Sequence, residues 1–142
     1  MKKWFLIIIV SPLIILWIYT GGSKLLDFPM FAHQLEMQNL PQWLTDGLKS
    51  TIPAAEIITA LLLCSGSTLR YGLMISTLMI LVFTIYTIMV LIGFFPKAPC
   101  SCGGIISTLS WKDHLTFNLF FLAINLTALS IVIFKERRTR HS

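Results

Sequence analysis

The sequence predicts an all-α fold, an integral membrane four-helix bundle with up-down-up-down topology in a single domain, residues 1–142. Three observations predict it: 56% of the 142 residues are hydrophobic, only 12% are charged, and four long apolar runs are separated by short polar segments. A soluble domain carries about 25% charged residues, so this chain belongs in a lipid bilayer. The net charge of +5 does not indicate nucleic-acid binding, because the basic residues gather near the chain ends.

The four predicted spans cover approximately residues 4–20, 48–66, 71–95 and 115–134. A helix of about 20 apolar residues crosses a hydrocarbon core roughly 30 Å thick. The second span is the least apolar, because it contains Pro53 and Glu56. The first could instead be a signal peptide, since Lys2 and Lys3 precede it, but it is longer than a usual signal core and lacks an A-x-A cleavage site. We therefore expect it to be retained.

A short interfacial helix is expected in the outer loop between the first two spans. Phe28, Phe31 and Leu35 recur at positions i, i+3 and i+7, and Trp43 and Leu44 follow. Such spacing is typical of a helix with one apolar face, which lies on a membrane interface. We expect this segment to cap the bundle.

The distribution of Lys and Arg predicts which way the loops face, since both termini of a four-span chain lie on the same side. Seven basic residues fall on the side of the termini: Lys2, Lys3, Arg70, Lys135, Arg137, Arg138 and Arg140. Four fall on the other side: Lys24, Lys49, Lys97 and Lys112. Because basic residues are enriched in cytoplasmic loops, we expect both termini in the cytoplasm and the loop after the third span outside.

That outer loop holds Cys100 and Cys102, separated by one residue. Disulfides persist outside the cytoplasm, and the strain of so short a ring makes a disulfide easier to reduce. The pair is interpreted as redox-active, with a permanent structural disulfide as the alternative. No metal site is expected, because a closed zinc site needs a second ligand pair beyond the two thiolates and His114. His114 is interpreted as an interfacial polar residue. Cys64 is expected to be a small core residue.

Polar residues near the outer ends of the spans form a second candidate site. Glu56 lies inside a predicted span, where a carboxylate is costly and seldom present without a partner or a role. Span order puts Lys24, Asp27 and Asn118 at the same membrane level, so we expect Lys24 to pair with Asp27 or Glu56. Pro53 is expected in the first turn of its helix, whose N-terminal dipole would favour the negative charge.

Three motifs in chain order carry a resemblance to a known family. The first span is followed by "GGSKLLDFPMFAHQL", the second opens with "PAAE", and the fourth is preceded by "CSCGG". In combination they resemble the DoxX-type four-helix membrane proteins, most closely the MauE branch, named for methylamine utilisation. The resemblance implies a redox-associated protein of the bacterial inner membrane that works with a periplasmic thioredoxin-like or cysteine-containing client protein.

Residue by residue, the resemblance marks Lys24, Asp27, Glu56, Cys100 and Cys102. In the MauE branch a Phe commonly follows the second cysteine, where this chain has a glycine. This difference keeps the dithiol but alters the loop beside it.

We therefore expect a membrane thiol–disulfide redox protein with Cys100, Cys102 and Glu56 as its catalytic groups. A membrane quinone could carry the electrons, although the sequence contains no quinone-binding motif. The candidate residues for holding a cofactor are Lys24, Asp27 and Asn118. The alternative is a non-catalytic assembly subunit of a membrane complex, with a permanent disulfide as a clip. A solute or metal carrier is disfavoured, because the chain lacks inverted halves.

Overall fold

The computed structural model describes residues 2–95 and 108–140, which form five helices and no strand. The four long helices are α1 (Lys2–Leu26), α3 (Gln42–Cys64), α4 (Leu69–Leu91) and α5 (Trp111–Arg140), and the short helix α2 (Phe28–Glu36) joins α1 to α3. All four long helices are long and apolar enough to cross a membrane. The predicted all-α class with four spans is confirmed, and the chain is a multi-pass membrane protein.

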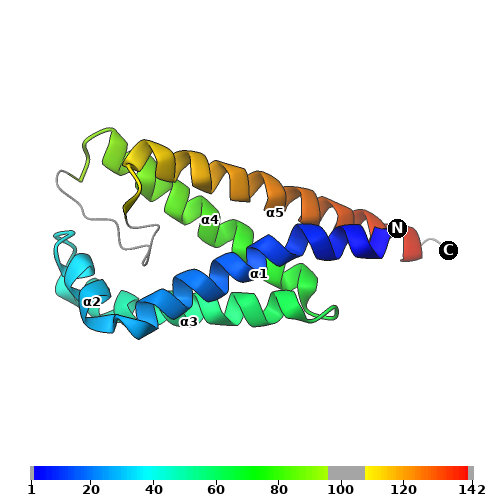
Figure 1. The fold of residues 1–142 in the computed structure, drawn as a ribbon, viewed down its shortest axis with the longest axis horizontal. Helices are drawn as coiled ribbons and strands as arrows, with labels where there is room; N and C mark the ends of the chain where they lie inside the picture. Colours follow the sequence, from blue (N-terminus) through cyan, green and yellow to red (C-terminus); the bar gives the residue numbers. More distant parts are fainter. Residues whose placement is uncertain (1, 96–107, 141–142) are drawn as a thin grey trace.

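The long helices form an antiparallel bundle with two distinct ends (Figure 1). The start of α1, the α3–α4 turn and the end of α5 lie together at what we call the terminal end, whereas α2, the end of α4 and the start of α5 lie at the α2 end. Helix α1 packs most extensively on α3 and α4 on α5, while α3–α4 and α1–α5 contacts close the ring. Successive long helices therefore run up, down, up and down.

Helix α3 begins at Gln42 rather than near residue 48, because Pro41 takes its N-cap position with φ −54° and ψ 138°. Trp43 and Leu44 consequently belong to α3 and not to the interfacial helix. Pro53 lies inside α3, so its predicted place in the first turn is wrong. The dipole at the start of α3 is then too distant to stabilise a charge at Glu56, since the effect falls off within the first turn.

Helix α2 is present where the sequence predicts a short amphipathic helix. The carboxylate of Asp27 accepts a hydrogen bond from the backbone N–H of Met30 at 3.4 Å, which caps the helix. Pro29 stands in the first turn, where its missing N–H costs nothing. Phe31 and Leu35 are buried against the bundle. The apolar face of α2 thus covers part of the α2 end.

The terminal half of the bundle has a close-packed apolar interior, made by Val10, Leu13, Leu63, Leu73, Ala128 and Val132. A Cβ at Gly72 would lie 3.0 Å from backbone atoms of Leu62 and Leu63, so α3 and α4 approach closely there. Asn125 of α5 is fully buried and donates to the carbonyl of Leu73, at 3.0 Å, and to the hydroxyl of Thr77. Polar groups in this half hold neighbouring helices together.

Cys64, the last residue of α3, is exposed at the terminal end, so its expected place in the core is wrong. Helix α3 turns the side of Thr59, Ala60 and Leu63 inward. Cys64 follows Leu63 by roughly 100° around the helix axis and therefore points away from the bundle.

Candidate functional site

Lys24 near the end of α1 and Glu56 within α3 form a buried ion pair. The ammonium Nζ lies 2.8 and 3.0 Å from the two carboxylate oxygens and also donates to the carbonyl of Thr20 at 3.3 Å. The two side chains are only 3% and 1% exposed. Of the two partners expected for Lys24, the structure selects Glu56. The opposite charge and the hydrogen bonds explain how a carboxylate persists inside a membrane helix.

Close packing of α1 on α3 positions this ion pair. A Cβ at Gly21 would lie 3.1 Å from Cβ of Glu56 and 2.9 Å from a terminal carbon of Ile57. Gly21 therefore lets the helices approach at the level of the carboxylate, and Lys24, three residues later, lies on the same face. The ring of Phe31 in α2 lies 5.8 Å from the Lys24 ammonium, close enough for a cation–π interaction.

Asp27, the other acidic residue predicted for this site, lies elsewhere. It is exposed, caps α2 and does not line the cavity described below. Helix α1 continues past residue 20 through both glycines to Leu26, which keeps Lys24 on the inner face and leaves Asp27 at the turn into α2. The sequence placed these two residues at the right level but could not give their orientation.

The ion pair forms part of the wall of a cavity of about 370 Å³. This volume falls within the range of roughly 300–1,000 Å³ typical of small-molecule sites. All five helices contribute, and most wall residues are apolar or aromatic. The polar wall residues are Thr20, Lys24, Gln38, Thr51, Glu56, Tyr86, Thr87, His114 and Asn118. An apolar cavity with a few convergent polar groups is the usual form of a ligand site.

Three polar residues on α4 and α5, Thr87, His114 and Asn118, form what we call the distal cluster. All three are buried, and Asn118 Nδ2 lies 3.4 Å from the Thr87 hydroxyl. The His114 ring stacks beside Trp111, with centroids 6.1 Å apart and planes inclined by 26°. His114 was expected at the interface, but α5 begins at Trp111 rather than near residue 115, so the histidine is inside the first turn and faces the cavity.

Phe83, Tyr86 and Thr87 of α4 also line the cavity, although they were not predicted as site residues. A usable signal was present in α4, whose buried residues recur at helical spacing and include Gly72, Ser76, Thr84 and Thr87. Small and hydroxyl-bearing residues at such intervals mark the inner face of a membrane helix.

Cys100 and Cys102 lie outside the described residues, so their pairing stays a prediction. The described residues on either side do line the cavity: Phe95 before the cysteine segment and Trp111 after it. The ring of Tyr86 contacts both, with centroids 5.7 Å from Phe95 and 6.1 Å from Trp111. Phe95 and Trp111, which flank the cysteine segment in the sequence, therefore both lie at the cavity.

The polar groups that line the cavity suit an organic ligand with polar oxygen atoms. It offers an ammonium, a carboxylate, an imidazole, an amide and hydroxyl groups on apolar walls. Across residues 2–95 and 108–140, no group of three or more His, Cys, Asp or Glu side chains is arranged to hold a metal ion.

Comparison with curated proteins and with solved structures returns no significant match. A family model described as methylamine utilisation protein MauE matches residues 2–132. The match includes the helices that carry the ion pair and the distal cluster, and it spans the cysteine segment. Since it covers nearly the whole chain, the protein belongs to the MauE family.

Proposed function

We propose that this MauE-family protein is a membrane thiol–disulfide redox protein that forms disulfides in an extracytoplasmic partner. Cys100 and Cys102 exchange with the partner, and a membrane quinone removes the electrons. The main support is the buried Lys24–Glu56 ion pair on a cavity wall, at the end of the bundle where Phe95 and Trp111 flank the cysteine segment. A buried ion pair contributes little net stability, and ionisable groups inside membrane helices usually serve function.

The proposed cycle has two balanced steps. In the first, a partner thiolate attacks the Cys100–Cys102 disulfide and forms a mixed disulfide, which the partner's second thiolate resolves. The partner gains an S–S bond, and both cysteines are left as thiols. In the second step the two thiols lose two electrons and two protons and re-form their S–S bond, while a quinone takes up both electrons and both protons and becomes a quinol.

Glu56 is the group proposed to accept a proton during reoxidation and to pass it toward the quinone. A positioned carboxylate can perform such general acid–base transfer. Lys24 fixes the carboxylate through both oxygens, at 2.8 and 3.0 Å, and so acts as its positioning residue.

The proposed location is the inner membrane of a bacterium, with both termini in the cytoplasm and the cysteine pair in the periplasm. The terminal end carries the denser basic charge, including Arg70 and the run of Arg137, Arg138 and Arg140. An excess of Lys and Arg marks the cytoplasmic side. The proposed partner is a periplasmic thioredoxin-like protein or another cysteine-containing client.

The redox state of the cysteine pair in cells tests this proposal. Differential alkylation should find Cys100 and Cys102 mostly oxidised in normal cells and mostly reduced after quinone depletion. Cys100→Ser and Cys102→Ser should each abolish disulfide formation in the partner, and one of them should trap a mixed disulfide. Cys64→Ser is the matched control, because Cys64 lies at the opposite end of the bundle, and it should leave partner oxidation unchanged.

A pair that stays oxidised with or without quinone, combined with a silent Cys100→Ser variant, would overturn the redox proposal. That result would leave the assembly-subunit function, in which the disulfide is a permanent clip.

A further inference from the structure

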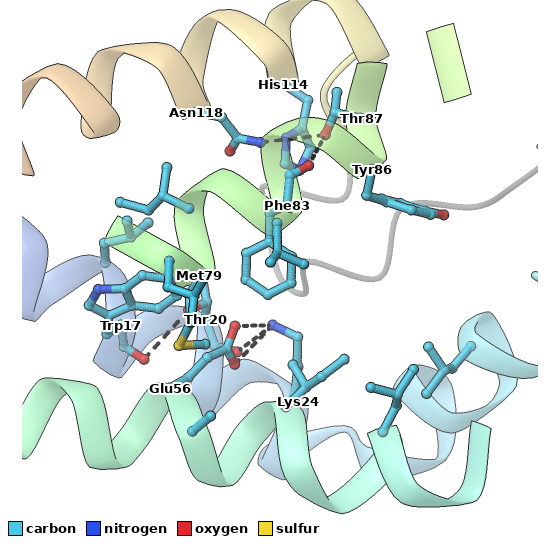
Figure 2. A pocket seen from close by; sticks show the side chains of 18 of the residues that line it. Trp17, Thr20, Lys24, Glu56, Met79, Phe83, Tyr86, Thr87, His114 and Asn118 are labelled. Atoms are coloured by element: carbon cyan, nitrogen blue, oxygen red, sulfur yellow. Dashed lines mark hydrogen bonds and ion pairs between the residues drawn. The ribbon is translucent and has the colours of Figure 1, made fainter. Parts of the chain in front are cut away.

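The cavity has polar groups on two sides and aromatic rings between them. Figure 2 shows the Lys24–Glu56 ion pair on one side and the distal cluster on the other, with the Phe83 ring between them in this view. The ion pair comes from α1 and α3, and the distal cluster comes from α4 and α5. A flat ring with an oxygen at each of two opposite edges would meet a hydrogen-bonding group at both edges and apolar side chains on its faces.

A second hollow lies on the outside of the bundle, beside the cavity. It is an open groove of about 590 Å³ between α1 and α5. Three of its residues, Leu16, Phe117 and Phe121, also line the cavity and so form a shared partition. The remaining groove residues are Ile8, Ser11, Pro12, Ile15 and Tyr19. Of the four neighbouring pairs of long helices, α1 and α5 make the least extensive contact.

We propose that cavity and groove together form one binding site for a membrane quinone. The quinone ring occupies the cavity, with one carbonyl oxygen toward the Lys24 ammonium and the other toward the distal cluster. The isoprenoid tail passes the partition of Leu16, Phe117 and Phe121 and lies in the groove, where it continues into the lipid. This inference rests on the proposed function in taking quinone as the electron acceptor, but binding itself does not require the cysteines.

The site fits a quinone better than a lipid acyl chain. A fully apolar chain in the cavity would place hydrocarbon against an ion pair, an imidazole and an amide, and contact between hydrocarbon and polar groups is unfavourable. A ring with two carbonyl oxygens presents a polar atom to the polar groups on each side. Among the described residues, the groove is lined mainly by apolar side chains, with hydroxyl groups only at Ser11 and Tyr19, as expected for the part of the site that holds a hydrocarbon tail.

Tryptophan fluorescence can test the location of the ring, since quinones quench nearby indoles. Trp17 and Trp111 line the cavity, whereas Trp4 and Trp43 are 73% and 77% exposed on the outside. The protein would carry Cys100→Ser and Cys102→Ser, so that no redox step occurs, and would be studied in lipid nanodiscs. With Trp4→Phe and Trp43→Phe, decylubiquinone should quench emission saturably. The complementary variant, Trp17→Phe with Trp111→Phe, should show only quenching proportional to concentration.

Polar-wall variants test the two carbonyl contacts. Thr87→Val with Asn118→Leu should weaken binding of decylubiquinone about three- to ten-fold, the effect of losing one hydrogen bond. Binding of the tailless ubiquinone head group should weaken by the same factor, because these residues are proposed to contact the ring. Menadione serves as the naphthoquinone arm and distinguishes a site for benzoquinones from one that also accepts menaquinone heads.

Two serines supply a matched test of the groove. The hydroxyl of Ser11 donates to the carbonyl of Ile7 at 2.7 Å, and that of Ser130 donates to the carbonyl of Leu126 at 2.8 Å, but only Ser11 lines the groove. Ser11→Phe should weaken binding of decylubiquinone at least about five-fold and leave the tailless head group within about two-fold. Ser130→Phe should change neither affinity.

Three results would overturn the quinone site: quenching that does not saturate, equal weakening of tailed and tailless quinones by Ser11→Phe, or quenching of the cavity tryptophans by brominated phospholipid in place of quinone. The last result would assign the cavity to acyl chains. Because the protein lacks both cysteines in these measurements, failure here removes the quinone site and leaves thiol–disulfide exchange intact. If the alkylation test fails instead, thiol–disulfide exchange is overturned and the quinone site is left intact.

Discussion

The two halves of this bundle bury polar side chains in different surroundings. In the terminal half, Asn125 lies within apolar packing, and its amide group donates hydrogen bonds to a carbonyl and a hydroxyl of α4. In the α2 half, Lys24 and Glu56 face a cavity of about 370 Å³. Asn125 does not line the cavity or the groove, whereas Lys24 and Glu56 both line the cavity. Protein interiors are normally close-packed, so a cavity beside buried charged groups favours a ligand site over simple packing.

The largest effect is expected from breaking the ion pair. Lys24→Met or Glu56→Leu alone leaves one uncompensated buried charge and should lower the free energy of unfolding by about 3–5 kcal/mol. The double variant removes both charges and should recover to within about 1 kcal/mol of the parent, or exceed it. It should nevertheless fail to reoxidise the cysteine pair with quinone. Unfolding in mixed micelles measures the stability of each variant, and quinol formation measures reoxidation of the cysteine pair.

The ion pair between Arg70 and Glu136 provides the control for that prediction. Its atoms are 2.8 Å apart, but both side chains are 43% exposed at the terminal end. Exposed pairs contribute about 0–1 kcal/mol. Arg70→Met should therefore change stability within that range and leave reoxidation unchanged. If Lys24→Met proves no more damaging than Arg70→Met, the difference between the halves does not lie in their charges.

The next effect concerns space, and two alanines test it. Ala128 on α5 is fully buried in the terminal half, whereas Ala55 on α3 lines the cavity. Ala128→Leu should overpack its site and lower the free energy of unfolding by about 1–3 kcal/mol. Ala55→Leu adds the same carbons toward open space and should cost less than about 1 kcal/mol while weakening quinone binding. Equal destabilisation by both would show that the two halves are equally well packed.

Much of the fold could be predicted from the sequence, because the signals for membrane helices are local. Four apolar runs gave the spans, and the spacing of Phe28, Phe31 and Leu35 gave α2. The predicted helix boundaries were less accurate at glycine and proline residues. Gly21 did not end α1, and Pro53 did not begin α3. Both errors have one cause, since packing between helices outweighs the local preference of a glycine or proline.

The candidate site could be predicted only in part. Span order placed Lys24, Glu56 and Asn118 at one level, since this needs only the direction of each helix. The choice of Glu56 over Asp27 as the partner of Lys24 depends on helix rotation, and the burial of His114 depends on where α5 begins. The cavity itself follows from side chains of all five helices meeting in space, which one sequence does not encode in any local pattern.

The smallest effect comes from one substitution made at two positions on α5. Asn118 and Asn125 lie about two turns apart on the same face, one at the cavity and one in the packed half. Asn125→Leu should lower the free energy of unfolding by about 0.6–1.7 kcal/mol, from the average to the maximum measured for hydrogen bonds between membrane helices. Quinone binding should not change. The hydrogen bond from Asn118 to Thr87 is long, at 3.4 Å, so Asn118→Leu should barely affect stability while weakening binding. If the two variants instead lose the same property, the division into a binding half and a packing half is wrong, because one helix face would then serve a single purpose along its length.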